Sequence, residues 1–190
     1  MPVNPTPRRI LLDLATTLDG FIEGKNGEVD WCIMEPDMGF IGFLEGIDTI
    51  LYGRKSYELW GRYLPPEDAP ENEKELWGQV HSKEKIVFSK TWHDPDNQTR
   101  IVRENIAEEM RRLKTLPGKD LWLYGGASLI TAFINLGLVD EFRLSVHPVI
   151  LGEGKPLFMD IRQRQNLKLV DARAFSSGVV QLIYHRENGR

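Results

Sequence analysis

Residues 121–130 read LWLYGGASLI, in which two glycines separate two apolar runs. Residues 121–124 predict a buried strand, and residues 129–136 predict a buried helix. Glycine weakens the interior of either element, so the pair at the junction indicates a turn with positive φ or a close approach of another group. Two interpretations stay open: a tight strand-to-helix turn, or a phosphate cradle formed by free N–H groups at the helix N-terminus.

Strand-like and helix-like segments alternate on both sides of this stretch. The strands expected before it are 8–14, 47–52, 85–88 and 101–102, and the helices are 36–44, 55–60 and 105–116. After it come a strand at 141–150 and a hairpin formed by 167–175 and 179–185. This order predicts an α/β fold with a mostly parallel sheet, flanking helices and an antiparallel C-terminal hairpin.

Two further segments have a simple local interpretation. Residues 63–75 are rich in proline and acidic residues, and are expected to form an exposed loop. Asn105 and Glu108 have the spacing of a capping box at the start of a helix.

The composition limits the class of protein. The chain has 190 residues, of which 41% are apolar and 27% charged, as in an ordinary globular domain. We expect a single domain over residues 1–190, with 1–7 as a tail. The net charge of −4 argues against broad binding to nucleic acid or anionic membranes. Neither a bilayer-spanning apolar run nor a signal-peptide pattern is present, so a cytoplasmic location is expected.

Metal and disulfide chemistry find little support. The single cysteine, Cys32, excludes an intrachain disulfide and is expected to be a small core residue. The four histidines lack the spacing of metal ligands, so no metal site is expected.

Three predicted strands end in small or basic residues. These ends are Gly53-Arg54-Lys55-Ser56, Ser89-Lys90 and Gly125 to Ser128. The carboxyl ends of parallel strands meet at one edge of a sheet, where ligands bind. Their N–H groups, hydroxyls and cations would suit a ligand with several phosphates, and Arg54 and Lys90 would suit the 2′-phosphate of NADPH. The G-x-G-x-x-G and Walker lysine fingerprints are absent.

The order of the motifs resembles the dihydrofolate reductase-like family. The resemblance runs from about Arg8 to Arg186 through ATTLDGFIEG, GRKSYELW, SKT, YGGASLI and PVILGEGKPLF. It is strongest to the C-terminal reductase domain of riboflavin-biosynthesis proteins, a 5-amino-6-(5-phosphoribosylamino)uracil reductase, and to its stand-alone relatives. It implies an NADPH-dependent reductase with an eight-stranded, mostly parallel sheet. Because the riboflavin relatives are commonly dimers, it also implies a homodimer.

The resemblance also assigns cofactor-binding residues. The residues that would flank the nicotinamide are Ala15, Asp19, Gly20, Phe21 and Ile22. Those that would bind the adenosine phosphate end are Gly53, Arg54, Lys55, Ser56, Ser89 and Lys90. Those that would hold the pyrophosphate are Gly125, Gly126, Ala127, Ser128 and Leu129.

The family's pterin pocket contains one indispensable carboxylate, on the first helix. Counting back from Gly53 without a gap places Asp37 there, with Glu35 as the fallback. Asp37 would orient the substrate and assist its protonation. Ser145, in FRLSVH, matches the hydroxyl partner of that acid.

Helical spacing bears on Asp37 independently. In a continuous helix Asp37 shares a face with Phe40, Ile41 and Leu44, which would partly desolvate its carboxyl group. The alternative is that an aspartate in the first turn merely complements the helix dipole.

The substrate stays open. Dihydrofolate reductases clamp the folate tail with an arginine after a YLP-like segment, whereas this chain has the acidic PPEDAPENE there. Arg62 could replace that arginine, but it lies before the YLP segment and not after it. A single cysteine also excludes the zinc deaminase domain of the riboflavin enzymes. Two functions remain: an NADPH-dependent reductase of a pterin, pyrimidine or other small heterocyclic or carbonyl compound, or an NADP(H)-binding module without turnover.

Overall fold

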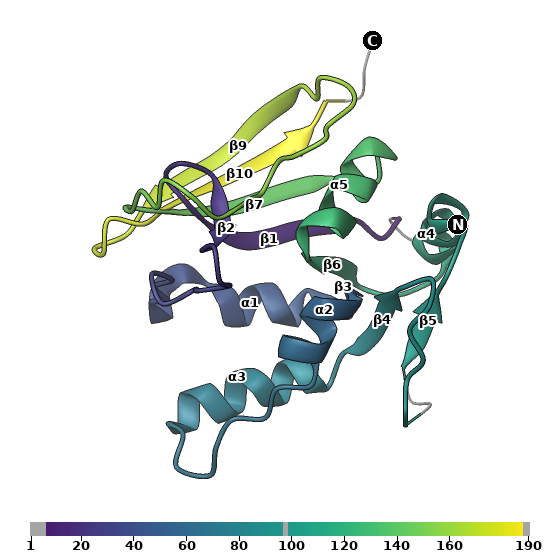
Figure 1. The fold of residues 1–190 in the computed structure, drawn as a ribbon, viewed down its shortest axis with the longest axis horizontal. Helices are drawn as coiled ribbons and strands as arrows, with labels where there is room; N and C mark the ends of the chain where they lie inside the picture. Colours follow the sequence, from purple (N-terminus) through teal and green to yellow (C-terminus); the bar gives the residue numbers. More distant parts are fainter. Residues whose placement is uncertain (1–6, 97–98, 188–190) are drawn as a thin grey trace, which may run out of the picture. The chain divides into compact units, whose positions relative to one another are not determined.

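The computed structural model describes residues 7–96 and 99–187, so residues 1–6 of the expected N-terminal tail lie outside the described residues. Eight strands form one sheet in the order β5-β4-β3-β6-β1-β7-β10-β9 (Figure 1). Strands β2 and β8 form a separate pair. The pairs β3–β4, β3–β6, β4–β5 and β1–β7 are parallel, whereas β10 is antiparallel to β7 and β9. The predicted fold class is therefore confirmed.

The chain divides into two compact units: residues 1–9 with 39–126, here unit 1, and residues 10–38 with 127–190, here unit 2. The expectation of a single domain stays a prediction. No helix in the described ranges is long and apolar enough to cross a membrane.

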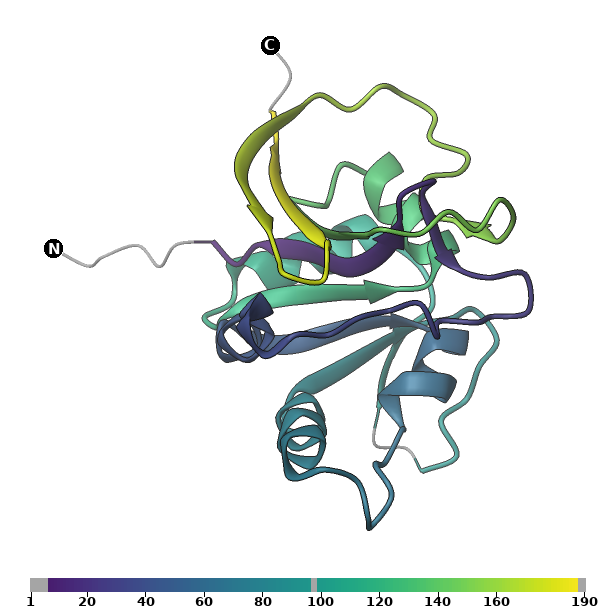
Figure 2. The same cartoon turned by 90° about the vertical axis from the view of Figure 1, so that its left-hand side faces the viewer.

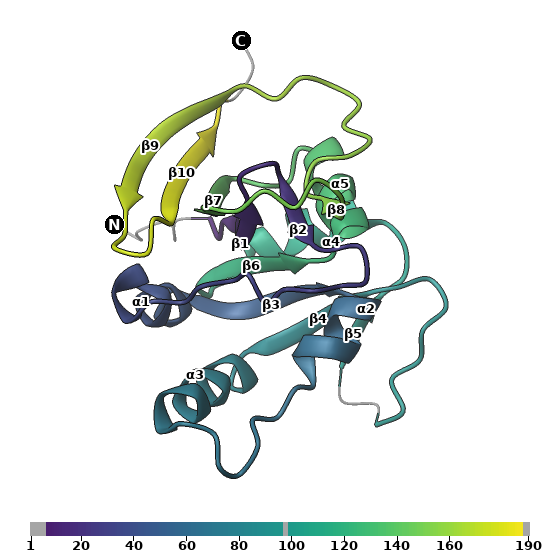
Figure 3. The same cartoon turned by 60° about the vertical axis from the view of Figure 1, so that its left-hand side comes forward.

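Unit 1 is built around the central strand β3. Its elements are α1 (Phe40–Glu45), β3 (Ile47–Gly53), α2 (Arg54–Ser56), a π-helical turn (Tyr57–Gly61), α3 (Glu71–His81), β4 (Glu84–Phe88), β5 (Arg100–Val102), α4 (Ile106–Thr115) and β6 (Asp120–Gly125). Ile50, Leu51 and Tyr52 of β3 are completely buried, as expected for a parallel strand covered on both faces. In Figure 3, β3 leads directly into α2.

Unit 2 holds the remaining strands. Its elements are β1 (Ile10–Thr17), β2 (Phe21–Glu23), a 3₁₀ turn (Pro36–Met38), α5 (Ala127–Asn135), β7 (Glu141–His147), β8 (Lys155–Pro156), β9 (Leu167–Ala174) and β10 (Val180–Arg186). The predicted C-terminal hairpin is confirmed, and Gly178 adopts a φ of 86° in its turn. Figure 2 shows this hairpin as a curved two-stranded ribbon in yellow.

The helix expected over residues 36–44 is interrupted. The 3₁₀ turn ends at Met38, Gly39 has a φ of 73°, and α1 begins at Phe40. A left-handed residue cannot continue a right-handed helix. The expectation that Asp37 shares a helix face with Phe40 and Leu44 is therefore wrong.

Two predictions about helix starts also fail. Residues 71–75 were expected in a loop but form the first turns of α3. The sequence signals for this helix were the acidic residues of the first turn, which follow Pro70, and His81 in the last turn. Asn105 precedes α4 with a φ of 55° and makes no side-chain capping bond, so the capping box with Glu108 is wrong.

Candidate functional site

In unit 1, the strands β3, β4 and β6 end at the same edge. The strand register pairs Gly53 with Phe88 of β4, and Tyr52 with Gly125 of β6. A Cβ atom on Gly53 would lie 3.4 Å from both Gly125 O and Gly126 N. The three strand ends that the sequence singles out therefore meet, as predicted.

The two glycines at the end of β6 have different reasons to be glycine. Gly125 adopts a φ of 120°, which a residue with a side chain rarely adopts, and the peptide bond between the glycines is cis. Gly126 has no such φ, but a Cβ atom there would lie 3.1 Å from Ser56 Oγ of α2. The turn itself requires the first glycine, and close approach to α2 restricts the second.

Cations gather beside these turns. Arg54 is half-exposed and forms an ion pair with Glu58 at 3.0 Å. Lys90 is exposed, and its carbonyl oxygen accepts a hydrogen bond from Arg103 NH1 at 3.1 Å. Ser89 N donates to Val102 O of β5 at 3.1 Å. The Ser89-Lys90 turn is thus anchored at the end of β5, where Arg103 adds a further cation to Arg54, Lys55 and Lys90.

Arg103 also lines a cavity. This cavity of about 360 Å³ is formed by Arg100, Ile101, Val102, Arg103, Glu104, Asn105, Glu108, Glu109 and Arg112. Arg100 and Arg112 both form ion pairs with Glu109. The sequence patterns do not identify Arg103. Its signal would have been a cation just after a strand, because Arg103 follows β5 as Lys90 follows β4.

In unit 2, the strand register forms a row of polar residues across the sheet. From β1 to β9 the row consists of Ala15, Ser145, Gln181 and Arg173. Register partners project from the same face of a sheet. Arg173 NH2 donates a hydrogen bond to Asp37 Oδ2 at 3.1 Å, so Asp37 lies at the outer end of this row.

The candidate acid and its expected hydroxyl partner are not in contact. The side chains of Asp37 and Arg173 are 59% and 53% exposed, so Asp37 does not lie on a buried apolar face. Within the described ranges, no hydrogen bond joins Asp37 to Ser145. Strands are about 4.8 Å apart, which puts Ser145 and Arg173 roughly 10 Å apart, with Gln181 between them. Gln181 and Arg173 belong to no sequence motif.

The fallback acid Glu35 is engaged elsewhere. Ser176 Oγ donates to Glu35 Oε2 at 2.8 Å, and Ser177 N donates to Glu35 Oε1 at 3.1 Å. Hydrogen bonds from Ser177 and Ser176 hold the pKa of Glu35 below its ordinary value. A carboxylate with both oxygens engaged suits an anchor of the hairpin turn better than a proton donor.

The loop expected beside the nicotinamide is organised by Asp19. Its carboxylate accepts hydrogen bonds from Thr17 Oγ1 at 2.6 Å and Gly152 N at 2.8 Å. The Thr17 hydroxyl, foremost, lowers the pKa of Asp19. Gly20 follows with a φ of 85°. Asp19 thus ties the Gly20–Ile22 stretch to the loop after β7.

The remaining expected residues divide by exposure. In α5, Ala127 and Leu129 are buried, so their side chains serve the core, whereas Ser128 is exposed. Lys55 is exposed at the start of α2. Cys32, expected in the core, is exposed.

Comparison with known proteins decides the family. Residues 8–181 match the family described as the RibD C-terminal domain. The chain belongs to this family. The Bacillus subtilis protein YyaP, itself uncharacterized, is 69% identical over 97% of this chain and 98% of its own length.

Solved structures share the fold. A Shewanella protein whose name refers to riboflavin biosynthesis has a TM-score of 0.78 and 24% identity, covering 95% of this chain and 99% of that one. Dihydrofolate reductase from Enterococcus faecalis, solved with NADP(H), has a TM-score of 0.63 and 18% identity, with coverage of 95% and 97%. This RibD C-terminal domain therefore has the fold of known reductases.

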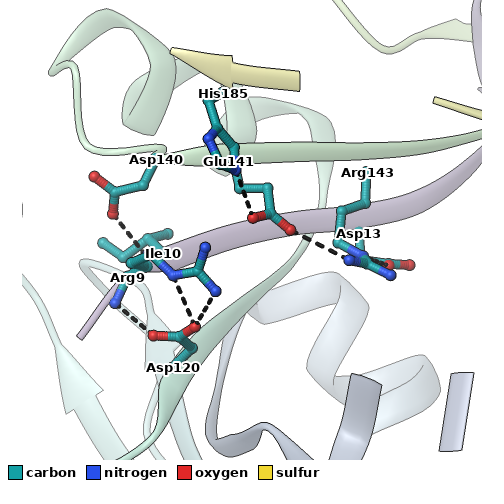
Figure 4. A network of polar contacts seen from close by, with 8 residues as sticks. All are labelled: Arg9, Ile10, Asp13, Asp120, Asp140, Glu141, Arg143 and His185. Carbon is teal, nitrogen blue, oxygen red and sulfur yellow. Dashed lines mark hydrogen bonds and ion pairs between the residues drawn. The ribbon is translucent and has the colours of Figure 1, made fainter. Parts of the chain in front are cut away.

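A charged network lies behind Ala15 and Ser145, with Asp13 and Arg143 two residues earlier on β1 and β7 and Glu141 four residues earlier on β7. Arg143 Nε donates to Asp13 Oδ2 at 2.9 Å and its NH1 donates to Glu141 Oε1 at 3.3 Å, while Glu141 Oε2 lies 3.0 Å from His185 Nε2 (Figure 4). Burial raises the pKa of Asp13 to about 6, against the opposing effect of Arg143. Charged residues inside the apolar runs LLDL and EFRL were the sequence signal for this network.

The raised pKa of Asp13 predicts a pH-dependent stability. Asp13 titrates near 3.8 when unfolded and near 6 when folded, so between these values the folded state binds the extra proton. The free energy of unfolding should then fall as pH rises through this window, by on the order of 3 kcal/mol at about 1.4 kcal/mol per pH unit. Urea unfolding from pH 4 to pH 7 measures this, with Asp13→Asn as the comparison because it cannot ionise. Parallel curves for the two proteins would contradict it.

Proposed function

We propose that this RibD C-terminal domain is an NADPH-dependent reductase that transfers hydride to a small heterocyclic compound of the pyrimidine or pterin type, or to a related carbonyl compound. The observation that carries the proposal is the meeting of three parallel strand ends in unit 1, which bring glycine backbone and cations to one edge. Such an edge is the usual ligand position in an α/β sheet.

The residues of unit 1 fit the phosphates of NADPH. Gly53, Gly125 and Gly126 have no side chains of their own that would hold a pyrophosphate away from the backbone. Arg54, Lys90 and the added Arg103 would contact the 2′-phosphate, since guanidinium and ammonium groups bind phosphate oxygens through charge-assisted bonds. The bound cofactor would supply the hydride.

The residues of unit 2 would hold the nicotinamide and the substrate. Ala15 and the loop that Asp19 organises would flank the nicotinamide, as the family resemblance implies. Ser145 and Gln181 offer a hydroxyl and an amide in the same row as Arg173. Asp37 would orient the substrate and assist its protonation.

The Asp37–Arg173 pair supports a pyrimidine over a folate. It presents an acceptor beside a donor, which complements the N–H and C=O of a lactam edge, as in a uracil ring. An amidine edge, as in a 2-aminopteridine, offers two donors. It would therefore pair with the two carboxylate oxygens of Asp37 and leave Arg173 without an acceptor. The folate-tail clamp also lacks support, because Arg62 forms an ion pair with Asp96 at 2.6 Å.

We expect NADPH to bind more tightly than NADH. A charge-assisted contact contributes about 1.5–3 kcal/mol to binding when it is shielded from solvent. Because these cations are exposed, the contribution of each is smaller. Each of Arg54→Ala, Lys90→Ala and Arg103→Ala should therefore weaken NADPH binding roughly 3- to 10-fold. NADH binding should not change. Calorimetry measures the dissociation constants. The matched control is Arg111→Ala, because Arg111 is an exposed cation on α4, away from the three strand ends.

Two outcomes would count against the proposal. Equal dissociation constants for the two cofactors would remove the 2′-phosphate assignment. Tight NADPH binding without its oxidation by uracil-type, pterin or carbonyl compounds would favour the alternative, a binding module without turnover. The homodimer and the cytoplasmic location stay predictions.

A further inference from the structure

His147 ends β7 and is buried, with 1% of its surface exposed. Its Nδ1 lies 2.9 Å from Ser145 O, which can only accept a hydrogen bond, so Nδ1 carries a proton. Its Nε2 lies 2.9 Å from Ile33 N, which can only donate, so Nε2 accepts this hydrogen bond through its lone pair. It is also 3.1 Å from Ile33 O. The tautomer with its proton on Nδ1 satisfies the contacts to Ser145 O and Ile33 N together, and it is the tautomer that we assign to His147.

Ile33 belongs to the segment 31–38, which carries the candidate acid. Trp31 packs edge-on against the His147 ring, with centroids 5.3 Å apart. Further along, Glu35 binds the hairpin turn, and Met38 is buried with Phe175 and Val179. The hairpin thus holds the second half of the segment, and His147 holds the first half against β7.

We propose that His147 is a positioning residue. Through Nε2 it holds the Ile33 backbone and thereby places Asp37, four residues further on, at the outer end of the row that contains Ser145 and Gln181. The inference rests on the role of Asp37 in the proposed function. A backbone hydrogen bond to a buried ring is costly to lose, and a displacement of about 1 Å at a reacting group can cost on the order of 100-fold in rate.

Two substitutions separate the hydrogen bonds of His147. In His147→Gln, the amide oxygen can reach the place of Nε2 and accept from Ile33 N. In His147→Asn, the shorter amide matches Nδ1 and can donate to Ser145 O, but it does not reach Ile33.

We expect His147→Asn to lower kcat by roughly 10- to 100-fold with an unchanged dissociation constant for NADPH. His147→Gln should stay within about 3-fold of the wild-type kcat. A merely structural role would instead lower kcat for both variants in step with their melting temperatures, and that result would overturn the proposal.

A second variant removes the bond from the other side. Ile33→Pro lacks the N–H donor, so His147→Asn combined with Ile33→Pro should lower kcat no further than His147→Asn alone. Additive losses would contradict the proposed contact.

Nuclear magnetic resonance tests the contact without any substrate. Nitrogen-15 spectra should show His147 protonated on Nδ1, and the Ile33 amide should exchange slowly in the wild type and His147→Gln but rapidly in His147→Asn. Rapid exchange in the wild type would overturn the proposal. Slow exchange in a protein that turns over no substrate would preserve the contact and refute the proposed function instead.

Discussion

Gly126→Val should abolish NADPH binding and leave the fold largely intact. The backbone of Gly126 does not need glycine for its φ, but its Cβ position lies 3.1 Å from Ser56 Oγ. A β-branched side chain would press against Ser56 Oγ, and in the proposed site it would also stand between a pyrophosphate and the backbone N–H groups. We expect the dissociation constant for NADPH, measured by calorimetry, to rise on the order of 100-fold or more, because several charge-assisted hydrogen bonds are lost together.

The matched control is Gly78→Val. Gly78 lies in α3 of the same unit, is exposed, and has no heavy atom within 4 Å of its Cβ position. This variant should bind NADPH like the wild type. Normal binding by Gly126→Val would show that the glycine pair serves only the strand-to-helix turn.

Asp37→Asn should lower turnover on the order of 100- to 10,000-fold while NADPH binding changes little, as is usual when general acid–base assistance is lost. Asparagine keeps the size of aspartate and can still accept a hydrogen bond from Arg173. The exposed ion pair contributes about 0–1 kcal/mol to stability, so the fold should persist. Steady-state kcat and KM across pH measure the effect, which should shrink at low pH for substrates that can be protonated in solution.

Glu35→Gln is the matched control for Asp37→Asn. Its carboxylate accepts from Ser176 and Ser177 of the hairpin turn. Glutamine keeps one oxygen that can accept from Ser177 N and has an amide that can donate to Ser176 Oγ, so the segment should stay in place and we expect only a small change in kcat. Full activity of Asp37→Asn on an accepted substrate would reduce Asp37 to an ordinary surface residue. A large loss in Glu35→Gln would then make Glu35 the candidate acid.

Much of unit 1 and the C-terminal hairpin of unit 2 could be predicted from local sequence patterns. The apolar runs of β3, β4 and β6 and the glycine or serine that follows each place three turns at one edge, because parallel strands in one sheet must end together. The C-terminal hairpin follows equally from its turn residues. These features depend on periodicity and turn chemistry, which short stretches of sequence contain.

The break in the helix expected over residues 36–44 could not be predicted from the sequence pattern. The spacing of Asp37, Phe40 and Leu44 is helical, yet Gly39 adopts a left-handed conformation and divides the segment. Glycine tolerates both hands of φ, so the surrounding contacts, and not its own preference, decide which it adopts.

The sequence by itself determined the α/β class, the order of strands and turns, and the residue types available to bind phosphates. Only the tertiary structure decided that Asp37 meets Arg173, 136 residues away, that Gln181 lies between Arg173 and Ser145, and that His147 holds Ile33. These contacts depend on strand register, and a shift of one residue would turn each side chain to the opposite face of the sheet. Register is set by packing of the whole unit, which no local pattern encodes.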